Sequence, residues 1–332
     1  MSKEVFITTV TSYFPNSPID NNSMEDYLGL ISGVHSRVKN IVLRQNGIKQ
    51  RFYAVNTKQE MTHTNAELAQ LSIQKLLTEA LLPLQELELL ACATASPDQV
   101  LPSHASMVHG LLKNAPMEIF SASGICLSCV QAFKIAYLSI LAGDKRNAVC
   151  SCSELASAGL LSKNFDVEYE KCANLGIQPY MALEKDFLRF MLSDGASAVL
   201  LQDNPGKGKA LHIEWVEMTS YANELPTCMF MGAEKEKNGE LKSWKSFSSQ
   251  ELTDRSLFTV KQDIKLLEKN AVPYWAKHIK YCLEKHNVAP ESISYVLPHV
   301  SSMFFYDKII NELKGIGIGI DESKWFTNLS RV

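Results

Sequence analysis

Cys126 is the residue of this chain whose position most directly suggests chemistry. It follows a strand-like run at 117–121 and the turn Ala122-Ser123-Gly124, and it begins an apolar helical segment that extends to Ala142. A thiol in the first turn of a helix lies near unpaired backbone N–H groups and the positive end of the helix dipole. Both favour the thiolate, which is the nucleophilic form of cysteine. The alternative is a buried structural cysteine, because free cysteine is among the most buried residue types.

His299 is the second candidate for chemistry. It comes directly after Pro298 and a predicted strand at 293–297. Functional groups gather where strands of a parallel sheet end, because the loops there open on a crevice. A histidine in that place can donate to or accept from a thiolate or a substrate carbonyl near neutral pH. The alternative is a histidine that only caps or packs.

Two further turns are weaker candidates. The small residues of Ser193-Asp194-Gly195-Ala196 suit a tight turn with close backbone approach, although such a sequence is usually just a turn. The segment Gln45-Asn46-Gly47-Ile48 also predicts a turn, shortly before Arg51. An arginine there is either a solvated side chain or an anchor for an anionic ligand.

Two close cysteine pairs raise the question of a metal site. Cys126-x-x-Cys129 has no second ligand pair at the spacing of a zinc site, and it lies in an apolar helix. Cys150 and Cys152 alternate along a predicted strand, so their thiols point to one face, where we expect them to pack. We therefore expect no metal.

The elements that must position these residues alternate along the first half of the chain. The predicted strands are 5–10, 87–93, 117–121, 147–152 and 197–202, and the predicted helices are 65–82, 105–112 and 126–142. Strands that alternate with helices of this size imply crossover units and a mainly parallel sheet.

The second half is less regular. Residues 203–209, rich in Asn, Pro, Gly and Lys, are typical of a boundary, and an irregular insertion is expected over 160–188. Beyond the boundary we expect a strand at 210–219, a polar surface excursion at 234–251, and helices at 257–286 and 302–313.

Composition limits the functional classes. The chain has 332 residues, 46% of them hydrophobic and 21% charged, with a net charge of −3, which argues against nucleic-acid binding by bulk electrostatics. The N-terminus lacks the apolar stretch of a signal peptide, and no apolar run reaches the roughly 18 residues of a membrane span. Eight cysteines are too dilute for a disulfide scaffold. We expect a cytoplasmic globular protein.

In their order and spacing, these pieces resemble a thiolase-fold condensing enzyme of the β-ketoacyl-acyl carrier protein synthase III type. The resemblance covers nearly the whole chain and rests on five motifs in order: Gly47-Ile48 with Arg51, Ser123-Gly-Ile-Cys126, Cys152-Ser-Glu154, Ser193-Asp-Gly-Ala196 and Leu297-Pro-His299. It implies an α/β fold with layered αβαβα architecture in two related halves. Residues 1–205 would carry the nucleophile, and residues 206–332 the histidine, without the last strands of that half.

The resemblance also implies a reaction. Cys126 would take an acyl group from a coenzyme A or phosphopantetheine thioester, and a malonyl-type extender would lose CO₂ and attack the acyl-enzyme with help from His299. Gly124 and Ser302 are expected to position substrate or stabilise an oxyanion, and Arg51 to bind coenzyme A. No cofactor would be bound permanently. The implied partners are acyl-CoA or acyl carrier protein, malonyl-acyl carrier protein, and a second subunit, identical or related, in a dimer.

The sequence departs from this family at three places. The usual His-x-x-Asn reads His299-Val-Ser-Ser302, the usual arginine before Gly47 is replaced by Gln45-Asn46, and the chain ends at Val332, before the expected Gly-Asn pair and glycine-rich turn. A shortened form and a naturally divergent form both explain these departures. Two alternatives to condensation also remain: acyl transfer without decarboxylation, and a catalytically silent partner subunit.

Overall fold

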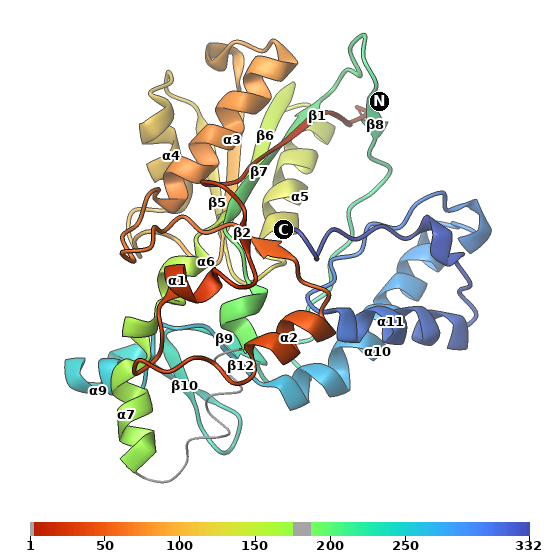
Figure 1. The fold of residues 1–332 in the computed structure, drawn as a ribbon. Helices are drawn as coiled ribbons and strands as arrows, with labels where there is room; N and C mark the ends of the chain where they lie inside the picture. The colour runs from red at the N-terminus through yellow and green to blue at the C-terminus, as the bar shows by residue number, and fades with distance from the viewer. Residues whose placement is uncertain (1–2, 175–186) are drawn as a thin grey trace. The chain divides into compact units, whose positions relative to one another are not determined.

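The structure is a computed structural model that describes residues 3–174 and 187–332 (Figure 1). The chain forms two compact units, and each is described by itself. Unit 1 consists of Met1–Pro18, Phe52–Ala158 and Ser193–Met218, and unit 2 of Ile19–Arg51, Gly159–Leu192 and Thr219–Val332. These units have other boundaries than the predicted halves 1–205 and 206–332. That the chain consists of two related halves stays a prediction.

Unit 1 is built on a six-stranded sheet with the order β5-β4-β6-β7-β1-β8. Its strands are β1 (Phe6–Tyr13), β4 (Leu89–Thr94), β5 (Glu118–Ser123), β6 (Asn147–Glu154), β7 (Gly195–Gln202) and β8 (Leu211–His212). Strand β4 is parallel to β5 and β6, whereas β7 is antiparallel to both of its neighbours and β8 is antiparallel to β1. The predicted parallel sheet is therefore mixed, with β1, β4, β5 and β6 running in one direction.

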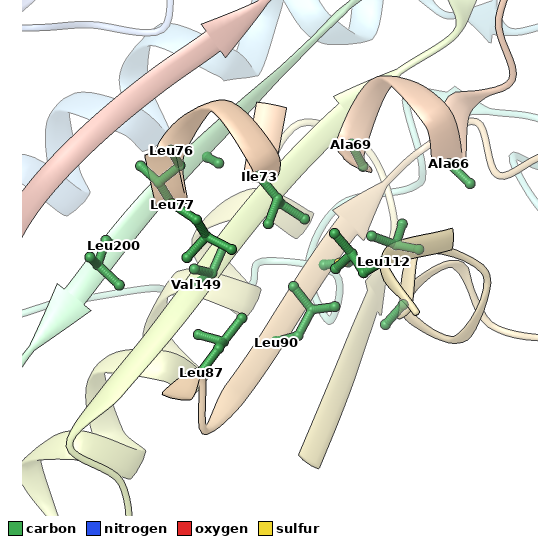
Figure 2. Close-up of a cluster of buried hydrophobic side chains, with 14 residues drawn as sticks. Ala66, Ala69, Ile73, Leu76, Leu77, Leu87, Leu90, Leu112, Val149 and Leu200 are labelled. Carbon is green, nitrogen blue, oxygen red and sulfur yellow. The ribbon is translucent and has the colours of Figure 1, made fainter. Parts of the chain in front are cut away.

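Helices cover both faces of this sheet. Figure 1 shows α3 (Asn65–Ala80) and α4 (His104–Leu112) on one face and α5 (Ser128–Leu141) on the other. Because successive strand residues point to opposite faces, Leu90 of β4 joins the α3–α4 core shown in Figure 2, whereas Leu89 joins the α5 core. Helix, sheet and helix are thus three consecutive layers.

Unit 2 is mainly helical. The long helix α10 (Ile264–Lys285) packs on α11 (Met303–Gly315) around a small core that includes Ala276, Leu283 and Leu313. The other elements are α1 (Met24–Leu28), α2 (Lys39–Gln45), α7 (Asp166–Asn174), α9 (Ser249–Asp254), and the strands β2 (Ile19–Asp20), β3 (Gln50–Arg51), β9 (Met229–Phe230), β10 (Ala233–Lys235), β11 (Leu241–Ser243) and β12 (Lys261–Gln262). Helix α6 (Ala156–Gly159) lies where the chain passes from unit 1 to unit 2.

Several predictions for the later part of the chain are wrong. The strand expected at 210–219 is only β8, and the strand expected at 293–297 is a single parallel bridge between Val296 and Trp325. The helix expected from 257 begins at Ile264. The excursion at 234–251 contains the β10–β11 hairpin and the first residues of α9. The supposedly irregular insertion 160–188 contains α7, and its residues 175–186 lie outside the described part of the chain.

None of the helices within residues 3–174 and 187–332 combines the length and the apolar character needed to cross a membrane.

Candidate active site

Cys126 lies in the turn between β5 and α5. Strand β5 ends at Ser123, Gly124 has a φ of 155° that side-chain-bearing residues rarely adopt, and α5 begins at Ser128. The sequence suggested that Cys126 lies in the first turn of this helix. In the structure, Cys126 precedes the helix. The residue is exposed. The nucleophile turn, residues 124–127, thus presents a thiol at the carboxyl end of a strand, where functional groups of α/β sheets gather.

The expected stabilisation of the thiolate is wrong for this structure. Desolvation raises the pKa of Cys126 above its usual value, and the negative charge of Glu154 raises it further. The backbone N–H of Cys126 itself favours the thiolate, but this effect is smaller than that of desolvation. The helix terminus contributes less than expected because α5 begins only at Ser128, and the dipole effect is confined to the first turn.

The other thiols near the turn lie inside the α5 side of unit 1. Cys150 and Cys152 both contact the core formed with α5, which confirms that they share one face of β6. The Cys150 Sγ lies 3.9 Å from the Cys129 carbonyl oxygen. Contact with Cys152 raises the pKa of Cys129. Within the described residues, no three His, Cys, Asp or Glu side chains gather in a way that would hold a metal ion.

Asp194 anchors the turn that the sequence singled out. Its buried carboxylate accepts hydrogen bonds from the backbone N–H of Ala54 at 2.6 Å, from the backbone N–H of Ser157 at 2.8 Å, and from the Ser157 hydroxyl. The neighbouring Ser193 hydroxyl accepts from the backbone N–H of Phe52 at 2.9 Å. The turn therefore fixes the segment after Phe52 and the chain after β6, and the Asp194 side chain is used for these structural contacts.

Burial raises the pKa of Asp194 to about 6. Because the folded state holds this proton more tightly than the unfolded state does, the contribution of Asp194 to stability is full below pH 4 and is lost as the pH rises through about 6. A rise of about two units in the pKa of Asp194 on folding corresponds to about 3 kcal/mol in the free energy of unfolding. In urea unfolding, we expect the wild-type free energy of unfolding minus that of Asp194→Asn to fall by about this amount between pH 4 and 6.5. A constant or growing difference would contradict the assignment.

Gly195 follows Asp194 where β7 begins, and the predicted close backbone approach is confirmed there. A Cβ at this position would lie 3.1 Å from Phe14 Cδ1 and 3.3 Å from the Tyr13 carbonyl oxygen. We expect Gly195→Ala to lower the free energy of unfolding by about 1–3 kcal/mol, as overpacking does. Gly208→Ala is the matched control, because a Cβ at Gly208 would have no atom within 4 Å. Equal urea midpoints for both variants would show that the contact is harmless.

His299 belongs to unit 2 and lies in an irregular segment before α11. It does not follow a strand, because residues 293–297 form only the single bridge at Val296. The residue is exposed, and desolvation lowers the pKa of its imidazole. His299 is therefore neutral at pH 7 and able to accept a proton.

Ser302 is buried and caps α11. Its hydroxyl accepts from the backbone N–H of Phe304 at 3.3 Å and donates to the Asn46 side-chain oxygen. The same Asn46 oxygen accepts from the backbone N–H of Met303 at 3.2 Å. These hydrogen bonds hold the start of α11 in place. That Ser302 also positions substrate or stabilises an oxyanion stays a prediction.

Arg51 is fully buried, contrary to the picture of a solvated side chain. Its guanidinium donates to the carbonyl oxygens of Met191, Gln50 and Leu329, each at 2.9 Å. These contacts make Arg51 a brace for the backbone of unit 2. Its predicted role in coenzyme A binding is not supported by this geometry and stays a prediction.

The sequence-predicted residues fall into two groups. Cys126 and Gly124 belong to unit 1, whereas His299, Ser302 and Arg51 belong to unit 2. That Cys126 and His299 belong to the same active site stays a prediction. Glu154 belongs to the motif Cys152-Ser-Glu154, for which no role of this residue was predicted. The signal for it is a carboxylate two residues after the predicted strand at 147–152.

Comparisons with known proteins bear on this arrangement. No protein-family model matches the chain. The chain is 22% identical over 317 residues to a β-ketoacyl-[acyl-carrier-protein] synthase III of Clostridium perfringens strain SM101, covering 96% of this chain and 82% of the relative. The structure of AbyA1, a tetronic acid condensing enzyme, has a TM-score of 0.67 and 21% identity, covering 98% of this chain and 87% of that one. Xanthomonas campestris OleA with bound lauric acid and lauroyl-CoA has a TM-score of 0.64 and 16% identity, covering 100% and 86%.

The fold of the chain is therefore the thiolase fold of condensing enzymes, as predicted. Over nearly its whole length the chain is similar to β-ketoacyl-[acyl-carrier-protein] synthase III enzymes at 22–23% identity, which confirms the predicted resemblance.

Proposed function

We propose that the protein forms an acyl-thioester on Cys126 and condenses the acyl group with a malonyl-type thioester to give a β-ketoacyl product, in fatty acid or polyketide biosynthesis. The observation that carries the proposal is the exposed thiol of Cys126, held in a glycine-containing turn at the carboxyl end of β5. Covalent catalysis of acyl transfer needs an accessible sulfur nucleophile in such a fixed position.

The first half-reaction follows from this geometry. The Cys126 sulfur attacks the thioester carbonyl, and the coenzyme A or phosphopantetheine thiol leaves with the proton. The backbone N–H of Cys126 is a suitable donor to the oxyanion that forms in the attack. Coenzyme A thioesters are reasonable donors because the related OleA binds lauroyl-CoA.

The second half-reaction is assigned to His299. A neutral imidazole can donate a hydrogen bond to the thioester oxygen of the extender and so stabilise the carbanion left when CO₂ departs. Its lowered pKa keeps the ring neutral at pH 7. Malonyl-acyl carrier protein as the extender, a homodimer or heterodimer, and a cytoplasmic location are parts of this proposal.

Acyl transfer without decarboxylation is the second candidate. It is favoured by Ser302, which replaces the family's asparagine and whose hydroxyl is bonded to Asn46. Transfer of an acyl group from Cys126 to another nucleophile needs no donor at that position.

A two-step assay separates these candidates. The protein is incubated with acetyl-CoA or lauroyl-CoA, and malonyl-acyl carrier protein labelled in the free carboxyl group is then added. Condensation predicts acylation of the protein, release of labelled CO₂ and a β-ketoacyl-carrier product. Acylation without CO₂ release would leave only acyl transfer. Absence of acylation by any thioester would contradict both and favour a catalytically silent subunit.

A further inference from the structure

Glu154 is a half-buried carboxylate for which the proposed reaction has no role. It ends β6, and its two oxygens accept three hydrogen bonds from the last residue of β4 and the loop that follows. The Ala95 backbone N–H donates to Oε1 at 2.7 Å, and the hydroxyls of Ser96 and Thr94 donate to Oε2 at 2.6 Å and 3.3 Å. All three donors are neutral. Desolvation raises the pKa of the Glu154 carboxyl, and these hydrogen bonds oppose that rise because they favour the charged form.

The register of the sheet places this loop next to the nucleophile turn. Strand β4 lies between β5 and β6, and Thr94 at its end is paired with Ser123, the last residue of β5. On the other side of β4, Ala93 is paired with Cys152, two residues before Glu154. Strands in a sheet lie about 4.8 Å apart. Glu154 and the nucleophile turn thus leave the same edge of the sheet on either side of one strand.

Helix α3 holds the loop in this place. The Asn65 side-chain amide donates to Thr94 Oγ1 at 2.8 Å and to the Ser96 carbonyl oxygen at 2.7 Å. The Ser96 hydroxyl also accepts from the backbone N–H of Leu155 at 2.9 Å. Asn65 is fully buried. The carboxylate, the loop and the end of β6 therefore form one fixed polar cluster.

Among the titratable groups of the packed elements, Glu154 and Cys129 are the two whose negative charge acts on Cys126. The other groups are the remaining thiols of the β6 and α5 segments, His104 of α4 and the exposed-loop carboxylate Asp98. Desolvation lowers the pKa of His104, whose Nε2 lies 3.0 Å from the Ser153 hydroxyl, so its ring is neutral at pH 7. Both oxygens of Asp98 accept backbone N–H groups at the start of α3. The charge of Glu154 acts on Cys126 and Cys129 alike.

We propose that Glu154 is a positioning residue for Cys126: it fixes the 94–96 loop beside the nucleophile turn and sets a negative charge there that disfavours the free thiolate. In acylation, the S–H bond of Cys126 and the C–S bond of the coenzyme A thioester break, a C–S bond forms on Cys126, and coenzyme A leaves as the thiol with the proton. The acyl-cysteine is neutral, so the charge of Glu154 costs it little. The carboxylate thereby suppresses stray reactions of the resting thiol while leaving the acyl-enzyme stable. This inference rests on the proposed role of Cys126 as nucleophile.

Alkylation of Cys126 by iodoacetamide tests the inference without any thioester. The rate is followed by mass spectrometry of the peptide that contains Cys126, from pH 6 to 11, in the full chain. We expect a wild-type midpoint above the ordinary thiol value of about 8.5. Removal of a nearby like charge in Glu154→Gln should lower the midpoint by about one pH unit. Because nucleophilicity falls with the pKa, alkylation at pH 7 should become about threefold faster.

Two further variants make the result specific. Glu154→Asp keeps the charge and should leave the midpoint within a few tenths of a unit of wild type. Glu88→Gln removes a carboxylate bonded to Arg146 just before β4, about 20 Å along the strand from Thr94, and should also match wild type. A folded Glu154→Gln variant with an unchanged or raised midpoint would overturn the inference. If that variant does not fold, a wild-type midpoint at or below 8.5 overturns it. Failure of acylation with a normal alkylation response would count against the proposed function alone.

Discussion

Replacement of Cys126 by alanine is expected to abolish the acyl-enzyme and every product that depends on it. The thiol is the only atom of the nucleophile turn that can form a thioester, and the turn offers no second nucleophile of comparable strength. Acyl-CoA turnover and CO₂ release should both fall to the uncatalysed background. The measurement is release of free coenzyme A and of labelled CO₂ by wild type and Cys126→Ala side by side.

Cys228→Ala is the matched control for this prediction. Cys228 is partly buried in unit 2, and desolvation raises its pKa as it does that of Cys126. Its loss removes a thiol of similar environment and should leave both activities at the wild-type level. Full retention of activity in Cys126→Ala, or equal losses in both variants, would contradict the assignment of Cys126.

Replacement of His299 by alanine should separate the two half-reactions. Acylation of Cys126 needs no group of this kind in the proposed mechanism and should persist. Condensation should fall by about 10²–10⁴-fold, the usual contribution of a positioned general acid or base. The measurement is CO₂ release from labelled malonyl-acyl carrier protein after acylation has been confirmed by mass.

The pH dependence of condensation gives a second readout for His299. Desolvation lowers the pKa of this imidazole below its ordinary value of 6.5, so the neutral form persists at pH 6.5 and condensation should decline only at lower pH. The decline should be absent from the residual activity of His299→Ala. His212→Ala, which removes an exposed ring paired with Glu214, should retain the wild-type profile. A midpoint above 6.5 would contradict the environment described for His299.

Local patterns in the sequence predict the first part of the fold well. Helix α3 begins at the capping box formed by Thr64 and Glu67, and its apolar residues face the sheet, in which β4 is buried along its whole length. Such elements are encoded within a few residues of themselves. Cys126 could be found in the same way, because a glycine turn between a strand and an apolar helix is a local signal.

Features that depend on distant parts of the chain could not be predicted. The run Ile293–Leu297 has strand-like residues, but its only sheet contact is the bridge to Trp325. Arg51 is buried because carbonyl groups near residues 191 and 329 accept its N–H groups. The pKa of Cys126 depends on desolvation and on Glu154, which is 28 residues away in the sequence. Sequence periodicity carries no information about such contacts.

Acceptance of the acyl group by Cys126 is the step on which the proposed reaction depends. The most direct measurement is the mass of the intact wild-type protein after incubation with acyl-CoA, followed by proteolysis and sequencing of the modified peptide by tandem mass spectrometry. We predict a single added acyl group, located on Cys126 and removed by neutral hydroxylamine, which cleaves thioesters. An unmodified Cys126 peptide, or an acyl group found on another residue, would show that Cys126 is not the acyl acceptor.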